Sequence, residues 1–462
     1  MTTQDKIKHL YWRAGFGQTI KEWKASENQT LSQSIDHLFA EAKSAKKLSG
    51  EELYHLNLAE KKNLLPNQRK QLRQKSKELI AQQNANWIGR MTDSKESSLL
   101  EKMSLFWHGH FACISKVPKT AFQQLVTIRQ HALGNFRELV LAIAKDPSMI
   151  RFLNNQQNKK NSPNENFARE LMELFTIGRG HYTEEDVKEA ARAFTGWSSN
   201  LKGEFVFKER QHDFGQKKFM GQKGTFNGDD IINIILDQKQ TAIFITTKVY
   251  RFFVNEKINT THIQQLADVF YHSKYDIEKL MRTIFQSDWF YASENVGNKI
   301  KSPIEFIAGM MRQLNVKFKD PSKVIFIQKA LGQILFNPPN VAGWPGGKSW
   351  IDNSTLMLRL NLINFLILAS DMSFKVKEEF EANNKNKIVK RIEANVDIQP
   401  LVNSFKNRSF EEIFNGLHNY LLQATPRQQQ DFFNGFVIKR NKEDYIKSMM
   451  IRLLSLPEYQ MS

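Results

Sequence analysis

The chain has only one cysteine among its 462 residues. Cys113 alone cannot form an internal disulfide framework, and it excludes zinc or iron–sulfur sites built from several cysteines. Any metal site would therefore use histidine and carboxylate ligands. The sequence also lacks a phosphate loop, a dinucleotide-binding glycine fingerprint, a nucleophilic serine elbow and a His-Glu-x-x-His pair, so nucleotide-driven chemistry and acyl transfer through a serine elbow are not expected.

Long uninterrupted apolar runs are also missing. The most apolar window, residues 356–373, is interrupted by Arg359, Asn361 and Asn364, whereas a membrane span needs about 20 mostly apolar residues. We therefore predict a buried helix there and no membrane span. The N-terminus lacks the basic, apolar and small-residue order of a signal peptide, which favours a cytoplasmic location. Export together with a signal-bearing partner, or loss of a leader, are the alternatives.

Negative charge is scarce relative to positive charge. Lys and Arg number 66 against 48 Asp and Glu, a formal net charge of +18. This excess favours acidic partners, such as nucleic acid, anionic glycans or small anions. The 34 phenylalanines and the 41% hydrophobic content supply material for a large core.

Apolar residues recur mostly at helical spacing, which predicts a mainly α fold: a large multi-helix domain with one small β-hairpin insertion. The hairpin is expected near 203–222, with 205–207 and 218–220 flanking glycine-rich turns. The capping-box pair Thr183 and Asp186 predicts a helix from Glu184, and Asp146-Pro147 separates two further helices.

Three integrated regions are expected along the chain: 1–98 with basic polar helices, 99–365 with the polar motifs, and 366–462 at the C-terminus. Within the first, residues 41–83 are dense in charge and sparse in apolar residues. This composition predicts long solvated helices, or a hairpin, around Leu65-Pro66.

Four polar segments lie within otherwise core-like sequence. They are KMSLFWHGHF (102–111), NENFARELMELFTIG (164–178) with its continuation to Trp197, HDFG (212–215) with its continuation to Asp230, and LGQILFNPPNVAGWPGG (331–347). Together with LYWRAGFG (10–17) and in this order, they resemble the bacterial domain of unknown function 1800 family along nearly the whole chain. The resemblance implies no particular reaction. It does imply that relatives are often exported and encoded beside a protein similar to the sulfatase and alkaline-phosphatase superfamily, so such a protein is an expected partner.

Histidine and glutamate supply the candidate metal ligands: His108, His110, Glu173 and His181. On a regular helix His108 projects about 160° away from His110, so both can bind one metal only if the helix breaks at Gly109. Otherwise one histidine is buried and hydrogen-bonded, and the other lies at the surface or supports a site from behind. A divalent metal ion is the cofactor that such a cluster would hold.

The candidate catalytic residues are Glu165, Glu170, His212 and Asp213. Glu165 belongs to an i,i+4 ladder with Arg169 and Glu173, which is either an exposed salt-bridged face or a functional cluster. His212 and Asp213 lie on a turn, where imidazole and carboxylate could act as a general base with its orienting partner or as metal ligands. Adjacent residues on a strand point to opposite faces, which argues against a direct hydrogen bond between them.

The candidate substrate-binding residues are Arg169, Asn340, Trp344 and Arg359. A guanidinium pairs bidentately with phosphate, sulfate or carboxylate, and the Trp344 ring offers a face on which a sugar or base could stack. These groups predict a polar cleft, rimmed by residues 340–347, for metal-assisted processing of an anionic or glycosylated substrate. The alternative is a non-catalytic basic helical scaffold that binds a partner protein or a polyanion. No motif supports sequence-specific nucleic-acid binding.

Overall fold

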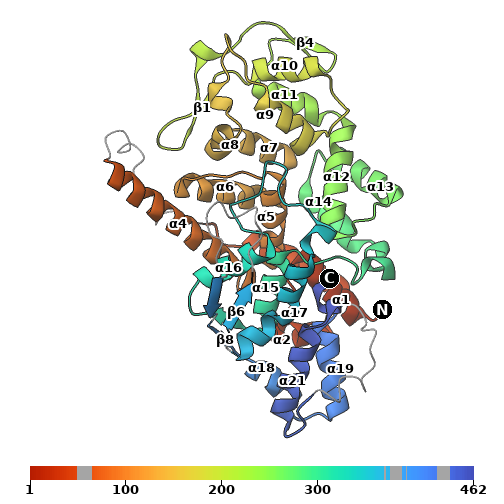
Figure 1. Cartoon of the computed structure of the whole chain (residues 1–462). Coiled ribbons are helices and arrows are strands. Elements are labelled where there is room, and N and C mark those ends of the chain that lie inside the picture. Colours follow the sequence, from red (N-terminus) through yellow and green to blue (C-terminus); the bar gives the residue numbers. More distant parts are fainter. Residues whose placement is uncertain (49–64, 369–370, 375–387, 392, 424–436) are drawn as a thin grey trace.

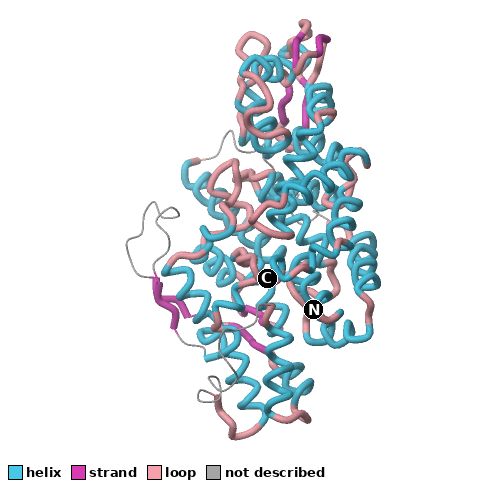
Figure 2. Tube along the Cα trace, turned by 90° about the vertical axis from the view of Figure 1, so that its right-hand side faces the viewer, coloured by secondary structure: helices cyan, strands magenta, loops and turns pink. Residues whose placement is uncertain are grey.

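The computed structural model describes residues 1–48, 65–368, 371–374, 388–391, 393–423 and 437–462. Helices dominate these ranges, and the strands form short antiparallel pairs (Figures 1 and 2). The predicted mainly α fold is therefore confirmed. Part of the polar region expected to form solvated helices, residues 49–64, lies outside the described residues.

Threonine caps define the first helices. Thr2, Thr19 and Thr30 each accept a backbone N–H and begin a capping box, an arrangement that satisfies amides otherwise left unpaired at a helix start. The helices are α1 (Thr3–Ala14), α2 (Ile20–Ala25) and α3 (Leu31–Ser44). Next, α4 (Pro66–Thr92) projects from the body in Figure 1 and is buried only from Gln83 onward, so the predicted solvated helix near Pro66 is present.

A first core is built around Trp107, Phe136, Phe194 and Ile245. Its helices beyond α1 and α3 are α5 (Ser98–His110), α6 (Pro118–His131), α7 (Phe136–Ala144), α8 (Pro147–Phe152), α9 (Asn166–Glu170), a π-helix (Leu171–Thr176), α10 (Glu184–Ala193), α11 (Gly228–Leu236), α12 (Lys239–Phe253), α13 (Thr260–His272) and α14 (Ile277–Gln286). The predicted boundaries at Asp146 and Thr183 are confirmed, since both residues are N-caps.

A second core is built around Trp87, Ile307, Leu362 and Leu417. It involves α2, α4 and the later helices α15 (Pro303–Leu314), α16 (Ser322–Leu331), α17 (Asn353–Leu368), α18 (Gln399–Phe405), α19 (Phe410–Leu421) and α21 (Lys442–Leu454). Helix α5 serves both cores, because Leu105 belongs to the second and Phe106 to the first. The seam between the two cores therefore runs along α5.

The expected β element is present, but its predicted pairing is wrong. Strand β2 (Phe205–Phe207) pairs with β1 (Trp197–Ser199), and β3 (Lys217–Phe219) pairs with β4 (Gln222–Gly224). The short 3-10 helix Glu209–Gln211 separates the two strands that we expected to pair, and each forms a hairpin with its own neighbour. Further pairs join β5 (Val316–Phe318) to β8 (Ala394–Val396) and β6 (Asp371–Phe374) to β7 (Ile388–Arg391).

Helix α17 occupies the apolar window predicted to be a buried helix, and it contributes Leu358, Leu362 and Leu366 to the second core. Of the helices in the described ranges, none is both long enough and apolar enough to span a bilayer.

Candidate functional site: a cationic cleft between the two cores

A cleft of about 460 Å³ lies at the seam between the two cores. One wall comes from α5 and α12, and the other from residues 299–305, Gln333 just after α16 and the loop 342–350. Its charged and aromatic lining residues are Phe106, His110, Lys248, Arg251, Phe252, Glu256, Lys299, Glu305, Trp344 and Trp350. The cleft thus combines several cations with two indole rings.

Helix α12 presents Lys248 and Arg251 to the cleft, and neither makes an ion pair with a described carboxylate. The Lys248 Nζ donates to the Leu174 carbonyl at 2.7 Å and lies 3.4 Å from His110 Nδ1. Burial, and then the charge of Arg251, lower the pKa of Lys248 to about 8. Two neighbouring cations without a described carboxylate partner form an electropositive wall.

Beneath this wall, Glu305 is a buried carboxylate shared by two ammonium groups. Its Oε1 accepts from Lys102 at 2.6 Å and from Lys299 at 3.0 Å, while its Oε2 accepts from the Ser302 backbone at 2.7 Å. Burial alone would raise the pKa of Glu305, but the charges of Lys102 and Lys299 outweigh it and lower the pKa. Glu305 also begins α15 as part of a capping box, so one carboxylate has a structural and an electrostatic task.

The positive charge around Glu305 exceeds the negative charge. The surrounding basic side chains, all buried, are Arg13, Lys102, Lys299, Lys301 and Arg359. Burial lowers the pKa of Lys301 well below its ordinary value, so Lys301 adds least to the positive charge. Burial lowers the pKa of Lys102 to about 8 and those of Arg13 and Arg359 to about 10. Because charge in a low-dielectric interior is costly without a partner, this cluster creates a field that favours an additional anion in the cleft.

The loop at the rim is held by a close backbone approach. Gly343 has a φ of +82°, and a Cβ there would overlap the Gly109 carbonyl oxygen of α5. This contact places Trp344 beside α5, where its ring lies 5.7 Å from that of His108. The 340–347 loop thus lies at the rim of a cleft that His110 also lines.

The chain matches the model of the family described as "Protein of unknown function (DUF1800)" over residues 9–461. The chain belongs to the DUF1800 family. The resemblance seen in the motifs is thereby confirmed. No curated protein and no solved structure matches this DUF1800 chain.

The two histidines of α5 are both buried, and neither lies at the surface, because α5 is enclosed by both cores. His108 Nε2 accepts the Phe336 N–H at 3.1 Å. His110 Nε2 lies 3.0 Å from the Phe175 carbonyl. A carbonyl can only accept, so this nitrogen carries the proton and Nδ1 can accept from Lys248. The two histidines therefore bond to different backbone groups, His108 to Phe336 and His110 to Phe175.

Burial of His108 predicts acid sensitivity. Its pKa falls to about 4 from an ordinary 6.5, so between these values the unfolded chain binds a proton that the folded chain does not. The stability from neutral His108 is complete above about pH 6.5 and is lost as pH falls to about 4, by about 3 kcal/mol. In urea unfolding across this pH range, the unfolding free energy of His108→Gln should fall less steeply with decreasing pH than that of the wild type. An unchanged slope would contradict this assignment.

The predicted metal ligands of this DUF1800 chain do not converge. In the part of the chain that the structure describes, no group of three or more His, Cys, Asp or Glu side chains could hold a metal ion. Glu173 instead pairs with Arg179, and His181 is exposed. The proposed set of His108, His110, Glu173 and His181 therefore finds no support in the geometry.

The predicted charge ladder is interrupted by the π-helix. Arg169 pairs with Glu165 at 3.0 Å and with Glu184 of α10 at 2.7 Å. Glu173 is excluded from the ladder because the wider π-turn over residues 171–176 changes the i,i+4 register on which it depended. Burial, and then the charge of Glu173, raise the pKa of Glu170. These residues do not line the cleft.

His212 and Asp213 have structural partners of their own. Asp213 pairs with Arg192 at 2.8 Å, and His212 Nδ1 donates to the Thr195 carbonyl at 2.8 Å. As expected for neighbouring residues, no direct His–Asp hydrogen bond is among the contacts of these two described side chains. They also lie outside the cleft lining.

Of the predicted substrate-binding residues, Trp344 lines the cleft and Arg169 does not. Asn340 Oδ1 accepts the Ala342 N–H and so shapes the rim loop. Arg359 is buried behind the cleft, where Nη1 donates to the Lys301 carbonyl while Nε and Nη2 have no partner among the described residues. Arg359 therefore adds to the positive electrostatic potential of the cleft but does not contact its surface.

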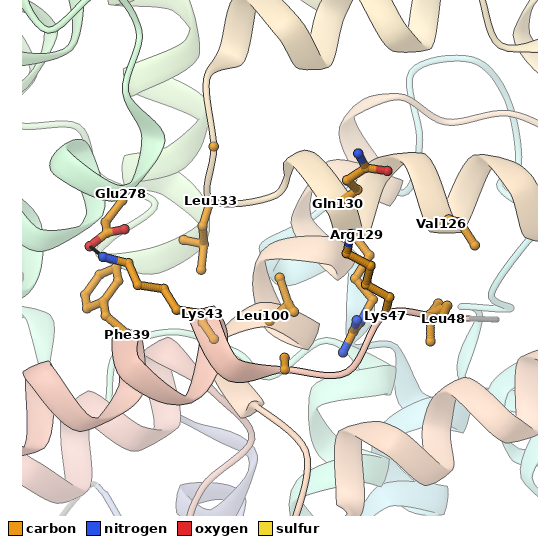
Figure 3. Close-up of a pocket in the computed structure, with 13 residues that line it drawn as sticks. Phe39, Lys43, Lys47, Leu48, Leu100, Val126, Arg129, Gln130, Leu133 and Glu278 are labelled. Carbon is orange, nitrogen blue, oxygen red and sulfur yellow. Dashed lines mark ion pairs between the residues drawn. The ribbon is translucent and has the colours of Figure 1, made fainter.

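A second cavity, of about 300 Å³, lies between α3, α6 and α14. Figure 3 shows the Lys43 ammonium pointing toward Glu278, with which it pairs at 3.1 Å. Arg129, in the same cavity, pairs with Glu101 at 2.7 Å. Lys47 also lines this cavity and makes no ion pair with a described carboxylate, but it is the one such cation there, whereas the cleft has Lys248 and Arg251. We therefore place the candidate site of the DUF1800 chain in the cleft.

Sequence reasoning missed Lys248, Arg251 and Glu305. The two cations look like ordinary surface residues of an amphipathic helix, and Glu305 looks like a capping residue after Ser302-Pro303. Lys102, inside the apolar segment LEKMSLFW, could have indicated a buried carboxylate such as Glu305, because a lysine enclosed by core residues requires a partner of opposite charge.

Proposed function

We propose that the cleft binds a small organic anion that carries a phosphate, sulfate or carboxylate group beside a ring. The observation that carries this proposal is the pair of cleft cations without described carboxylate partners, Lys248 and Arg251. An anion placed between them would receive charge-assisted hydrogen bonds. Lys299 would provide a third positive group, because it shares its ion-pair partner Glu305 with Lys102.

The rest of the cleft suits the organic part of such a ligand. Trp344 and Trp350 line the side opposite α12, and Phe252 lines the α12 side. Flat aromatic faces favour sugars or other rings over a fully hydrated inorganic ion. Glu256, also in the lining, could accept hydrogen bonds from ligand hydroxyl groups. A cleft of this volume is within the usual range for small-molecule sites.

Replacing Arg251 by Gln should weaken anion binding about tenfold or more, because a charged hydrogen bond contributes about 1.5–3 kcal/mol. We would measure thermal shifts and calorimetric binding for phosphate, sulfate and a panel of phosphorylated, sulfated and carboxylated sugars, each against its neutral parent at matched ionic strength. The anionic members should bind and stabilise the protein more than the neutral parents.

The matched control is Lys239→Gln, which removes a cation from the other end of α12, where Lys239 pairs with Asp268 outside the cleft. This variant should bind as the wild type does. The proposal fails if no anion in the panel stabilises the wild type beyond its neutral parent, or if Arg251→Gln and Lys239→Gln weaken binding equally.

A further inference from the structure

Three exposed apolar side chains lie in the segment that forms the two hairpins at one end of the molecule. Leu201, Phe207 and Phe214 are 60%, 38% and 64% exposed. All lie on or beside the β1–β2 and β3–β4 hairpins, which occupy one tip of the structure in Figures 1 and 2. Large apolar residues grouped at a surface mark interaction sites.

The two phenylalanines belong to a fixed array of rings. The His212 ring lies 5.1 Å from that of Phe207 and 4.7 Å from that of Phe214, both edge to face. His212 is itself anchored by its hydrogen bond to Thr195. The HDFG motif therefore holds two exposed rings in place.

Positive charge lies beside these rings. Lys208 and Arg210 follow Phe207 in the chain. The Lys160 N–H donates to the Gln211 carbonyl at 2.8 Å, which brings the 159–160 turn alongside. The exposed cations are Lys159, Lys160, Lys208 and Arg210, and none of them makes an ion pair with a described carboxylate.

Nearby carboxylates do not cancel this charge. Asp213, next to Phe214 in the chain, is neutralised by Arg192. Glu209 lies between Lys208 and Arg210 and is exposed, but a single carboxylate leaves the group of four cations with an excess of positive charge. The surface is therefore both aromatic and cationic.

We propose that this surface, formed by Phe207, Phe214, Lys159, Lys160, Lys208 and Arg210, binds single-stranded nucleic acid without sequence preference. Bases would stack on the phenylalanine rings while the cations contact phosphates, the combination by which such strands are held non-specifically. The chain's net charge of +18 adds long-range attraction. An acidic protein partner would also use the cations and pack on the rings, but it would not require flat stacking faces, so ring substitutions distinguish the two partners.

The test is fluorescence anisotropy with a labelled twelve-nucleotide oligo-dT on the full chain. Phe214→Leu keeps apolar bulk but removes the ring, and it should weaken binding about fivefold or more; Phe214→Trp should preserve or strengthen binding. Lys208→Gln should reduce the steepness with which affinity falls as salt rises. Because Phe214 is largely exposed, circular dichroism should show both variants folded like wild type.

Several results would overturn the proposal: no binding of oligo-dT at low salt, equal affinities for the Leu and Trp variants, or equal preference for duplex DNA. Stronger binding of heparin that ignores the ring substitutions would also overturn it, by assigning the surface to polyanions in general. Arg251→Gln should leave oligo-dT binding unchanged, so this surface and the cleft can fail independently.

Discussion

Replacing Glu305 by Gln should destabilise the protein by about 3–5 kcal/mol, because removal of one member of a buried ion pair leaves charge uncompensated in the interior. The amide can still accept from the Ser302 N–H, so the loss would come mainly from Lys102 and Lys299. Urea unfolding at neutral pH would measure it. The difference in unfolding free energy between wild type and variant should become smaller below about pH 4.5. In that range the unfolded wild-type chain binds a proton at Glu305, whereas the folded chain, in which the pKa of Glu305 is lowered, does not.

Two further variants separate the electrostatic effect from loss of the helix cap. Glu412 closes an equivalent capping box with Ser409 on α19, but both residues are exposed to solvent. Glu412→Gln should therefore have little effect. Adding Lys102→Met to Glu305→Gln removes one stranded cation and should recover part of the lost stability. Equal losses for Glu305→Gln and Glu412→Gln would show that Glu305 acts only as a cap.

Local features of the fold could be predicted from the sequence. Asp146 and Thr183 have side chains that can accept the first free amides of a helix, and both boundaries that they predicted are present. Residues 205–207 and 217–219 do form strands, but their pairing depends on the intervening 3-10 helix, whose path no periodicity indicates. The Glu165–Arg169 step of the predicted ladder is present, whereas the step from Arg169 to Glu173 is missing at an unforeseen π-helix.

The candidate site was predictable only in part, because it lies where two cores meet. Trp344 and His110 stood out as polar or aromatic groups in unusual surroundings, and both line the cleft. Lys248 and Arg251 gave no signal, since a cation on a helix has the same local pattern whether it faces solvent or a cleft. Conversely, His212 and Asp213 stood out for chemical reasons, yet Thr195 and Arg192 satisfy them. Partners distant in sequence decide which polar residues remain available.

Gly343→Ala should destabilise the rim loop and weaken anion binding in the cleft, because the added methyl group causes both backbone strain and a steric overlap. A non-glycine residue at a φ of +82° is strained, at a cost of about 1–3 kcal/mol. The new Cβ would also overlap the Gly109 carbonyl oxygen, and because that oxygen belongs to the backbone of α5 the loop must move. We expect a lower melting temperature and, with Trp344 displaced, loss of anion binding together with a change in intrinsic tryptophan fluorescence.

Two neighbouring glycines provide matched controls for this effect. Gly346 has a φ of −95°, and a methyl group added to its Cα would meet no described atom within 4 Å, so Gly346→Ala should leave stability intact. Because Gly346 and Gly109 both line the cleft, their variants are controls for stability alone. Gly109→Ala would meet only the edge of the Trp344 ring at 4.0 Å, and in a helix alanine is favoured over glycine by up to about 1 kcal/mol. If Gly343→Ala has the same melting temperature as these two variants, the close approach between the loop and α5 does not hold the loop in place.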